Sequence, residues 1–171
     1  SLPLDTIMAE KLSRKDGEIL PYMIDYAAGS GHFITEFMHE IQDIINDCNT
    51  SKYIEETRKH LINWQNCHFD WATDYVYGIE KDYRLVKVGK VGCYLHGDGL
   101  ANVILSDGLA NFCNNKEYKE KLCKQVNDGQ KDNQQFDILL SNPPYSVPSF
   151  RQTTRDYYTE QDFELYNSLT D

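Results

Sequence analysis

The sequence predicts a doubly wound α/β fold, in which helices cover both faces of a parallel β-sheet. Short apolar segments alternate along the chain with segments of helical periodicity. A glycine-rich turn separates the first apolar segment from a strongly amphipathic helix, and acidic or polar residues follow each apolar segment. Parallel strands need a crossover connection, usually a helix, and the alternation supplies one.

The first elements are a short helix, a strand and an amphipathic helix. We expect the short helix at Thr6 to Leu12 and the first strand at Pro21 to Asp25. After the glycine turn, apolar residues recur at three- and four-residue intervals, which predicts a helix: Ile34, Phe37, Met38, Ile41 and Ile45. The polar stretch from Asn46 to Asp74 is either an insertion or a second helix over the sheet, with an apolar side formed by Leu61, Ile62 and Trp64.

Two further strands and a crossover follow. Tyr75 to Ile79 is the second predicted strand, ending at Glu80. The pattern from Asp82 to Leu95 fits either a helix or a strand, and we predict a helix because parallel strands need a crossover. The apolar residues that suit this helix are Leu85, Val88 and Leu95. Val103 to Leu105 is the third strand, ended by Asp107-Gly108.

The last third of the chain contains the fourth predicted strand. We expect a charged surface helix from Asn114 to Val126 and a loop from Asn127 to Gln135. Phe136 to Leu140 is the fourth strand, which stops at Asn142-Pro143-Pro144-Tyr145, and a helix is expected from Glu160 onward. The four parallel strands should lie in the order three, two, one, four. Sheets of this class usually have more strands, so the sheet is expected to be truncated after about four.

Composition indicates one globular domain over residues 1–171. Hydrophobic residues make up 40% and charged residues 26% of the 171 residues. No apolar run approaches the ~20 residues of a membrane span, and no signal peptide opens the chain. Five scattered cysteines favour reduced thiols in a cytoplasmic protein. No metal site is expected, because the candidate ligands lack ligand spacing: His60, Cys67, His68 and His96.

Polar residues at the four strand ends predict a binding site. In open parallel sheets, ligands bind beyond the carboxyl ends of the strands, where this sequence places Gly29, Gly31, Glu80, Asp107 and Asn142. A glycine turn brings bare backbone and a helix N-terminus to a ligand. Glu80 is suited to both hydroxyls of a ribose, and Asp107 to an exocyclic amine such as that of adenine. The long separation between Gly31 and Glu80 disfavours NAD, because in NAD-binding folds the ribose-binding acid follows the glycine turn after ~20 residues.

Each of these features also has an ordinary structural interpretation. The glycine turn can be a simple strand-to-helix connection, Glu80 a solvated strand end, and Asp107-Gly108 a common turn. Each is weak alone, but their ordered occurrence at successive strand ends favours a cofactor site.

The Asn142-Pro143-Pro144-Tyr145 turn is the most informative feature of the sequence. The prolines stiffen the turn, so the Asn142 side chain and the Pro143 carbonyl provide two acceptors for the hydrogens of an –NH2 group. Tyr145 supplies a flat face for stacking on a base. An amine held in this way can direct its lone pair at a methyl sulfonium. The alternatives are a proline turn that closes a strand and a proline-rich peptide ligand, for which the stretch is too short.

The glycine turn and this motif together resemble the gamma-type N6-adenine DNA methyltransferases, most closely the modification subunit of type I restriction-modification systems. Their first motif, Asp-Pro-Ala-Cys-Gly-Ser/Thr-Gly-Gly-Phe, is similar to residues 25–33, with departures at Tyr26, Ala28 and His32. The resemblance implies a Rossmann-like class I S-adenosylmethionine-dependent fold. It implies these cofactor-binding residues: Asp25, Ala27, Gly29, Ser30, Gly31, Phe33, Glu80 and Asp107. Asp98 is a rival of Asp107 for the adenine contact.

The resemblance also implies the reaction and the partners. The methyl group of S-adenosylmethionine would be transferred to N6 of a flipped adenine in a specific duplex DNA site, with catalytic residues Asn142, Pro143, Pro144 and Tyr145. The specificity and restriction subunits of a type I complex are the expected protein partners, although a fused restriction-methylation enzyme is left open. Rival activities are methylation of a release-factor glutamine or of RNA guanine N2, and a non-catalytic cofactor-binding fragment is a third alternative.

The family pattern further implies that the chain is a fragment. A phenylalanine-containing cofactor motif would lie at or before Ser1, and the later strands and target-recognition region would follow Asp171. The formal net charge of −10 agrees with DNA being held mainly elsewhere, since Lys and Arg on phosphates dominate such binding. Arg151 and Arg155 are the local candidates for phosphate contacts, or are simply exposed.

Overall fold

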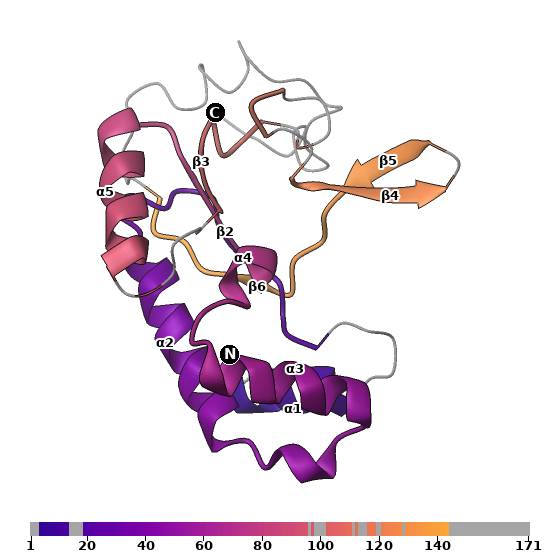
Figure 1. The fold of residues 1–171 in the computed structure, drawn as a ribbon. Helices are drawn as coiled ribbons and strands as arrows, with labels where there is room; N and C mark the ends of the chain where they lie inside the picture. Colours follow the sequence, from indigo (N-terminus) through magenta and orange to yellow (C-terminus); the bar gives the residue numbers. More distant parts are fainter. Residues whose placement is uncertain are drawn as a thin grey trace.

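A computed structural model describes residues 4–13, 19–95, 97, 102–110, 112, 116–118, 121–127 and 129–143. Its centre is a four-stranded, fully parallel sheet with the order β3-β2-β1-β6 (Figure 1). The strands are β1 Met23–Asp25, β2 Val76–Glu80, β3 Asn102–Leu105 and β6 Ile138–Leu139. The predicted α/β class and strand order are therefore confirmed.

One helix precedes the first strand, as predicted, and helices form the crossovers between the first three strands. Figure 1 shows α5 and then α2 along one side of the molecule, with the β4–β5 hairpin standing away on the other. The α-helices are α1 Leu4–Ser13, α2 His32–Asp47, α3 Glu55–Asn66, α4 Ala72–Tyr75 and α5 Tyr83–Leu95. Single 3₁₀ turns, η1 Thr50–Lys52 and η2 Lys116–Tyr118, lie in the connections.

One face of the sheet is covered by the larger hydrophobic core. All five apolar residues that predicted α2 are buried there: Ile34, Phe37, Met38, Ile41 and Ile45. They share this core with the strand residues Met23, Val76 and Val103. Gly78 of β2 allows the close contact, because a Cβ at that position would collide with the Ile34 side chain.

The opposite face of the sheet has its own smaller core. Alternate strand residues Ile24, Ile79 and Ile104 point to this side and pack with Tyr118 and Leu122, from η2 and the segment after it. Burial on both faces explains why these strands read as continuous apolar runs rather than as alternating patterns.

The Gln42 side chain joins α2 to the insertion between residues 46 and 74. Its Oε1 accepts hydrogen bonds from the Phe69 N–H (2.9 Å) and the Trp71 Nε1–H (3.0 Å). Its Nε2 donates to the Trp64 carbonyl (3.0 Å) and to Asn46 Oδ1 (2.9 Å). Gln42 is only 2% exposed, and these four bonds use both donors and both acceptor positions of the amide. The insertion is thus a packed layer over α2.

The prediction for residues 114–135 is wrong. In place of a surface helix and a loop, the described residues there form η2 and the antiparallel hairpin of β4 Cys123–Asn127 and β5 Gln130–Asn133. Gly129 at the turn has φ of 88°, a left-handed conformation that glycine adopts without strain. The Asp128-Gly129 pair is a hairpin signal that outweighs the helix propensity of the charged residues before it.

Several predicted elements exist but differ in detail. Helix α5 is confirmed, yet it buries Val86, Gly89 and Cys93 and exposes the residues that suggested it: Leu85, Val88 and Leu95. In α3, Ile62 is exposed rather than part of the apolar side.

The fourth strand pairs over two residues only, and Leu139 is 62% exposed because β6 is an edge strand of the described sheet. The helix expected from Glu160 lies outside the described residues. Within the described ranges, no helix is long and apolar enough to cross a membrane.

Gln42→Leu is expected to lower the free energy of unfolding of the chain by roughly 2–4 kcal/mol, since several buried polar groups lose their partner at once. Urea unfolding measures the effect. Gln134→Leu is the matched control, because the Gln134 amide donates to the Gln135 carbonyl at an exposed position and should change stability by no more than about 0.5 kcal/mol. Equal losses in the two variants would contradict the role given to Gln42.

Candidate active site

The carboxyl ends of the four parallel strands bring the described members of the predicted site to one edge of the sheet. Glu80 at the end of β2 accepts a hydrogen bond from the Gly29 N–H (2.8 Å), which belongs to the turn after β1. Asp25 at the end of β1 accepts one from the Ser141 hydroxyl (2.9 Å), which follows β6. The ends of β1, β2 and β6 are therefore connected directly through two carboxylates.

The glycine turn after β1 has the close backbone approach that its sequence indicates. Gly29 and Gly31 have φ of 55° and 85°, in the left-handed region that disfavours other residues. Gly31 also lies against α5, because a Cβ there would be 3.3 Å from the Gly89 Cα. The Ala28 N–H donates to the Ile79 carbonyl (2.9 Å), which fixes the turn over β2. Of the other predicted contacts in this turn, Ser30 and Phe33 are exposed.

The Glu80 carboxylate is held rigidly at the end of β2. While Oε2 binds the Gly29 N–H, Oε1 accepts from the Asp82 N–H (2.7 Å). Each carboxylate oxygen can accept a second hydrogen bond, so two fixed acceptor positions are left for a ligand. This arrangement suits a pair of vicinal hydroxyls.

Asp107 lies beyond the end of β3 and is also oriented by its neighbours. Its Oδ1 accepts from the Leu109 N–H (3.1 Å), and its Oδ2 forms an ion pair with the exposed Lys81 ammonium (3.0 Å). Gly108 packs on the turn after β1, because a Cβ there would collide with the Tyr26 carbonyl. The third strand end thus joins the same group of loops. The rival residue Asp98 lies outside the described part of the chain.

Asp25 is the most deeply buried acid of the described site, with 1% exposure. Its Oδ1 accepts from the Ala27 N–H (3.0 Å) and from the Ser141 hydroxyl (2.9 Å). Its Oδ2 is buried and has no hydrogen-bond partner among the described residues. Burial raises the pKa of the Asp25 carboxyl above its ordinary value; the two hydrogen bonds oppose this rise, and the nearby Glu80 carboxylate adds to it.

The start of the proline turn is anchored to β1. The Leu140 N–H donates to the Ile24 carbonyl (3.2 Å), and the Ser141 hydroxyl donates to Asp25. The next residue, Asn142, is exposed at the same sheet edge, and Pro143 is half-buried. The remaining residues predicted to contact DNA or the base lie outside the described part of the chain: Pro144, Tyr145, Arg151 and Arg155.

Sequence reasoning missed three residues of this edge. Ser141 and Lys81 each adjoin a predicted site residue, so their position at a strand end was available as a signal. Gly89 lies within α5 and lets this helix approach the glycine turn, a contact that no local pattern indicates. In the described ranges, no three His, Cys, Asp or Glu side chains come together to hold a metal ion.

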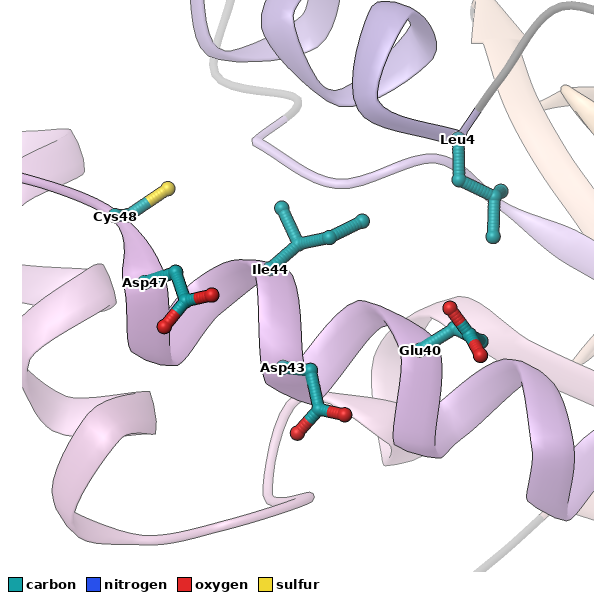
Figure 2. Close-up of a pocket in the computed structure, with 6 residues that line it drawn as sticks. All are labelled: Leu4, Glu40, Asp43, Ile44, Asp47 and Cys48. Atoms are coloured by element: carbon teal, nitrogen blue, oxygen red, sulfur yellow. The ribbon is translucent and has the colours of Figure 1, made fainter.

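A separate pocket of about 500 Å³ lies at the other end of α2 (Figure 2). Figure 2 shows that α2 supplies most of its lining and that Leu4 of α1 faces it; the lining residues are Leu4, Glu40, Asp43, Ile44, Asp47 and Cys48. None of the predicted site residues lines this pocket. The candidate active site is therefore the sheet edge and not this acidic hollow.

Comparisons with known proteins agree with the geometry of the sheet edge. The sequence is similar to the type II restriction enzyme and methyltransferase RM.Eco57I of Escherichia coli, with 26% identity over 163 residues. The similarity covers 82% of this chain but only 16% of that relative. The sequence model of the N-6 DNA Methylase family matches residues 3–168, nearly the whole chain. The chain therefore belongs to the N-6 DNA methylase family.

Proposed function

We propose that this chain is the cofactor-binding and catalytic part of an enzyme that transfers a methyl group from S-adenosylmethionine to N6 of a flipped adenine in duplex DNA. The observation that carries the proposal is the joining of three strand ends through Asp25 and Glu80. It places the glycine turn, two fixed carboxylates and the start of the Asn142-Pro143 turn at one edge of the sheet.

The described residues fit this cofactor. The Oδ2 of Asp25 is buried and has no hydrogen-bond partner in the described ranges, so it provides a negative acceptor for a cationic or hydrogen-donating group, such as the ammonium of the methionine part. The remaining acceptor positions of Glu80 suit the ribose hydroxyls. Asp107 suits the adenine amine when the Lys81 ammonium moves away from its Oδ2. Gly29 and Gly31 leave room for the methionine end, where Ala27, Ser30 and Phe33 complete the proposed contacts.

The chemistry of the proposed reaction rests on the turn after β6. The cofactor, when bound, supplies an electrophilic methyl group on a sulfonium. Asn142 Oδ1 and the Pro143 carbonyl would accept the two hydrogens of the adenine amine and direct its lone pair at that methyl group. Tyr145 would stack on the flipped base and offset part of the few kcal/mol that unstacking costs.

Similarity to a restriction enzyme and methyltransferase supports a place for this chain in a restriction-modification system. That relative is both a restriction enzyme and a methyltransferase, which favours a fused enzyme, whereas the type I specificity and restriction subunits stay a prediction from motif resemblance. Membership of the N-6 DNA methylase family favours DNA adenine over a release-factor glutamine or an RNA guanine as the acceptor.

Asp25→Asn is expected to stabilise the cofactor-free chain at neutral pH and to weaken cofactor binding. Burial raises the Asp25 pKa in the folded state, so the charged carboxylate costs stability above that pKa. The cost disappears as the pH falls through the folded pKa towards the ordinary value of about 3.9, and the two proteins should then converge. Urea unfolding from neutral pH to about pH 4 tests this, with exposed Asp43→Asn as control. A variant less stable than the unmutated chain at neutral pH would contradict it.

Glu80→Ala is expected to weaken binding of S-adenosylmethionine or its product by roughly 1–3 kcal/mol, because the ribose hydroxyls lose their acceptors. Isothermal titration calorimetry measures the change. Glu56→Ala, an exposed acid on α3, should bind as the unmutated protein does. Tighter binding of NADH than of the sulfonium cofactor would refute the cofactor assignment.

Asn142→Ala is expected to reduce methyl transfer sharply in the full-length protein while leaving cofactor binding nearly intact, since its contact strengthens mainly in the transition state. Tyr145→Phe should be mild, because the ring face survives. Tyr145→Ala should lose stacking worth roughly 1–3 kcal/mol. Transfer of labelled methyl groups to duplex DNA measures all three. Unchanged turnover in Tyr145→Ala, or label on cytosine or on protein glutamine, would show that the assignment is wrong.

A further inference from the structure

The hydroxyl of Ser141 connects the two halves of the candidate site. It donates to Asp25 Oδ1 at 2.9 Å, across a sequence separation of 116 residues. Asp25 Oδ1 also accepts a hydrogen bond from the Ala27 N–H at 3.0 Å. This one carboxylate oxygen is therefore bound by both the glycine turn and the segment after β6. The other oxygen of Asp25 is buried and has no partner among the described residues.

Ser141 is also the last anchored residue before the catalytic turn. The Leu140 N–H still pairs with the Ile24 carbonyl at 3.2 Å, in continuation of the strand ladder. No hydrogen bond of the Asn142 side chain occurs among the described residues, and that side chain is exposed. The position of Asn142 relative to β1 is therefore set by the residue immediately before it.

We propose that Ser141 is a positioning residue, which couples the cofactor-binding carboxylate of Asp25 to the placement of Asn142 for methyl transfer. This inference rests on the proposed function and assigns a role to a residue outside the Asn-Pro-Pro-Tyr motif. Asp25 contacts the cofactor through Oδ2, and its Oδ1 holds the hydroxyl next to Asn142. The same buried carboxylate thereby positions both the acceptor amine and the methyl donor.

The coupling works because the shared carboxylate is rigid. Asp25 lies at the end of an interior strand, is 1% exposed, and has its orientation fixed by the Ala27 N–H. A hydroxyl bound to such a group cannot move far without losing its hydrogen bond. Displacement of reacting groups by about 1 Å can cost 10²-fold in rate, so this bond affects catalysis more than binding.

The first test is methyl transfer by the full-length protein at saturating cofactor and DNA. In Ser141→Ala the single-turnover rate should fall by about 10- to 100-fold, because Asn142 is no longer held in position relative to the methyl donor. The cofactor Kd should change by no more than about threefold, since Asp25 keeps Oδ2 and the Ala27 contact. Ser141→Thr keeps the hydroxyl and should restore most of the rate. Ser141→Cys, a weaker donor, should be intermediate.

Ser51→Ala is the matched control. The Ser51 hydroxyl donates to Asn49 Oδ1 at 2.6 Å in an exposed turn, so the variant also loses one serine hydrogen bond but lies far along the chain from the site. It should leave both rate and cofactor Kd unchanged. Thermal unfolding of each variant establishes that it is folded, and the Thr and Cys variants decide the outcome if the Ala variant is not.

A second test uses the pH dependence of cofactor binding. The charged groups at this position are the Asp25 carboxylate and the nearby Glu80 carboxylate, and the Ser141 hydrogen bond lowers the Asp25 pKa. Its removal should raise that pKa, so the loss of cofactor affinity at low pH should begin at higher pH in Ser141→Ala than in the unmutated protein. An unchanged profile would show that the Ser141 hydroxyl does not bind the Asp25 carboxylate.

The outcomes separate the two proposals. If the unmutated full-length protein methylates DNA adenine but Ser141→Ala does so at the same rate, the positioning role is overturned while the proposed function stands. The role is also overturned if Ser141→Thr is as slow as Ser141→Ala, or if the pH profile of cofactor binding does not move. If the unmutated protein transfers no methyl group to adenine, the proposed function fails and this inference fails with it.

Discussion

Met23, Ile24 and Asp25 form an interior strand of the sheet, paired with β2 on one side and β6 on the other. Both faces of this strand are buried, so its last residue has its carboxylate inside the protein. All strands run parallel, and their carboxyl ends must therefore meet around that residue. The glycine turn, Glu80 and the segment at Ser141 are arranged as they are because β1 holds this position.

Burial of Asp25 has opposite effects on stability and on binding. An isolated carboxylate in the interior is unfavourable unless its lone pairs are used. Among the described residues, Asp25 Oδ1 has two donors and Oδ2 has none. A cofactor that supplies the missing donor would gain a charge-assisted hydrogen bond in a desolvated setting. The proposed site would thus be most stable when the cofactor occupies it, a trade-off common where function requires a strained or unsatisfied group.

The sequence was sufficient to predict the elements with strong local signals. The periodicity of α2, the glycine turn and the order of polar residues at strand ends all describe interactions within a few residues, or follow from parallel topology. The hairpin at residues 123–133 was missed because Lys, Glu and Gln favour helix in isolation. Burial of Tyr118 and Leu122 under the sheet overrides that preference, since tertiary packing decides weak local propensities.

Side-chain pairing at the site could not be read from local patterns for a different reason. The bond between Ser141 and Asp25 depends on the register of β6 against β1, in which Met23 pairs with Ile138 and Ile24 with Leu139. A slip of one residue would turn the β6 side chains to the opposite faces and remove the hydroxyl from Asp25. Sequence motifs indicate which residues contact a ligand, whereas strand register determines which neighbouring residues position them. The role of Ser141 could therefore be inferred only from the fold, which brings this residue next to Asp25.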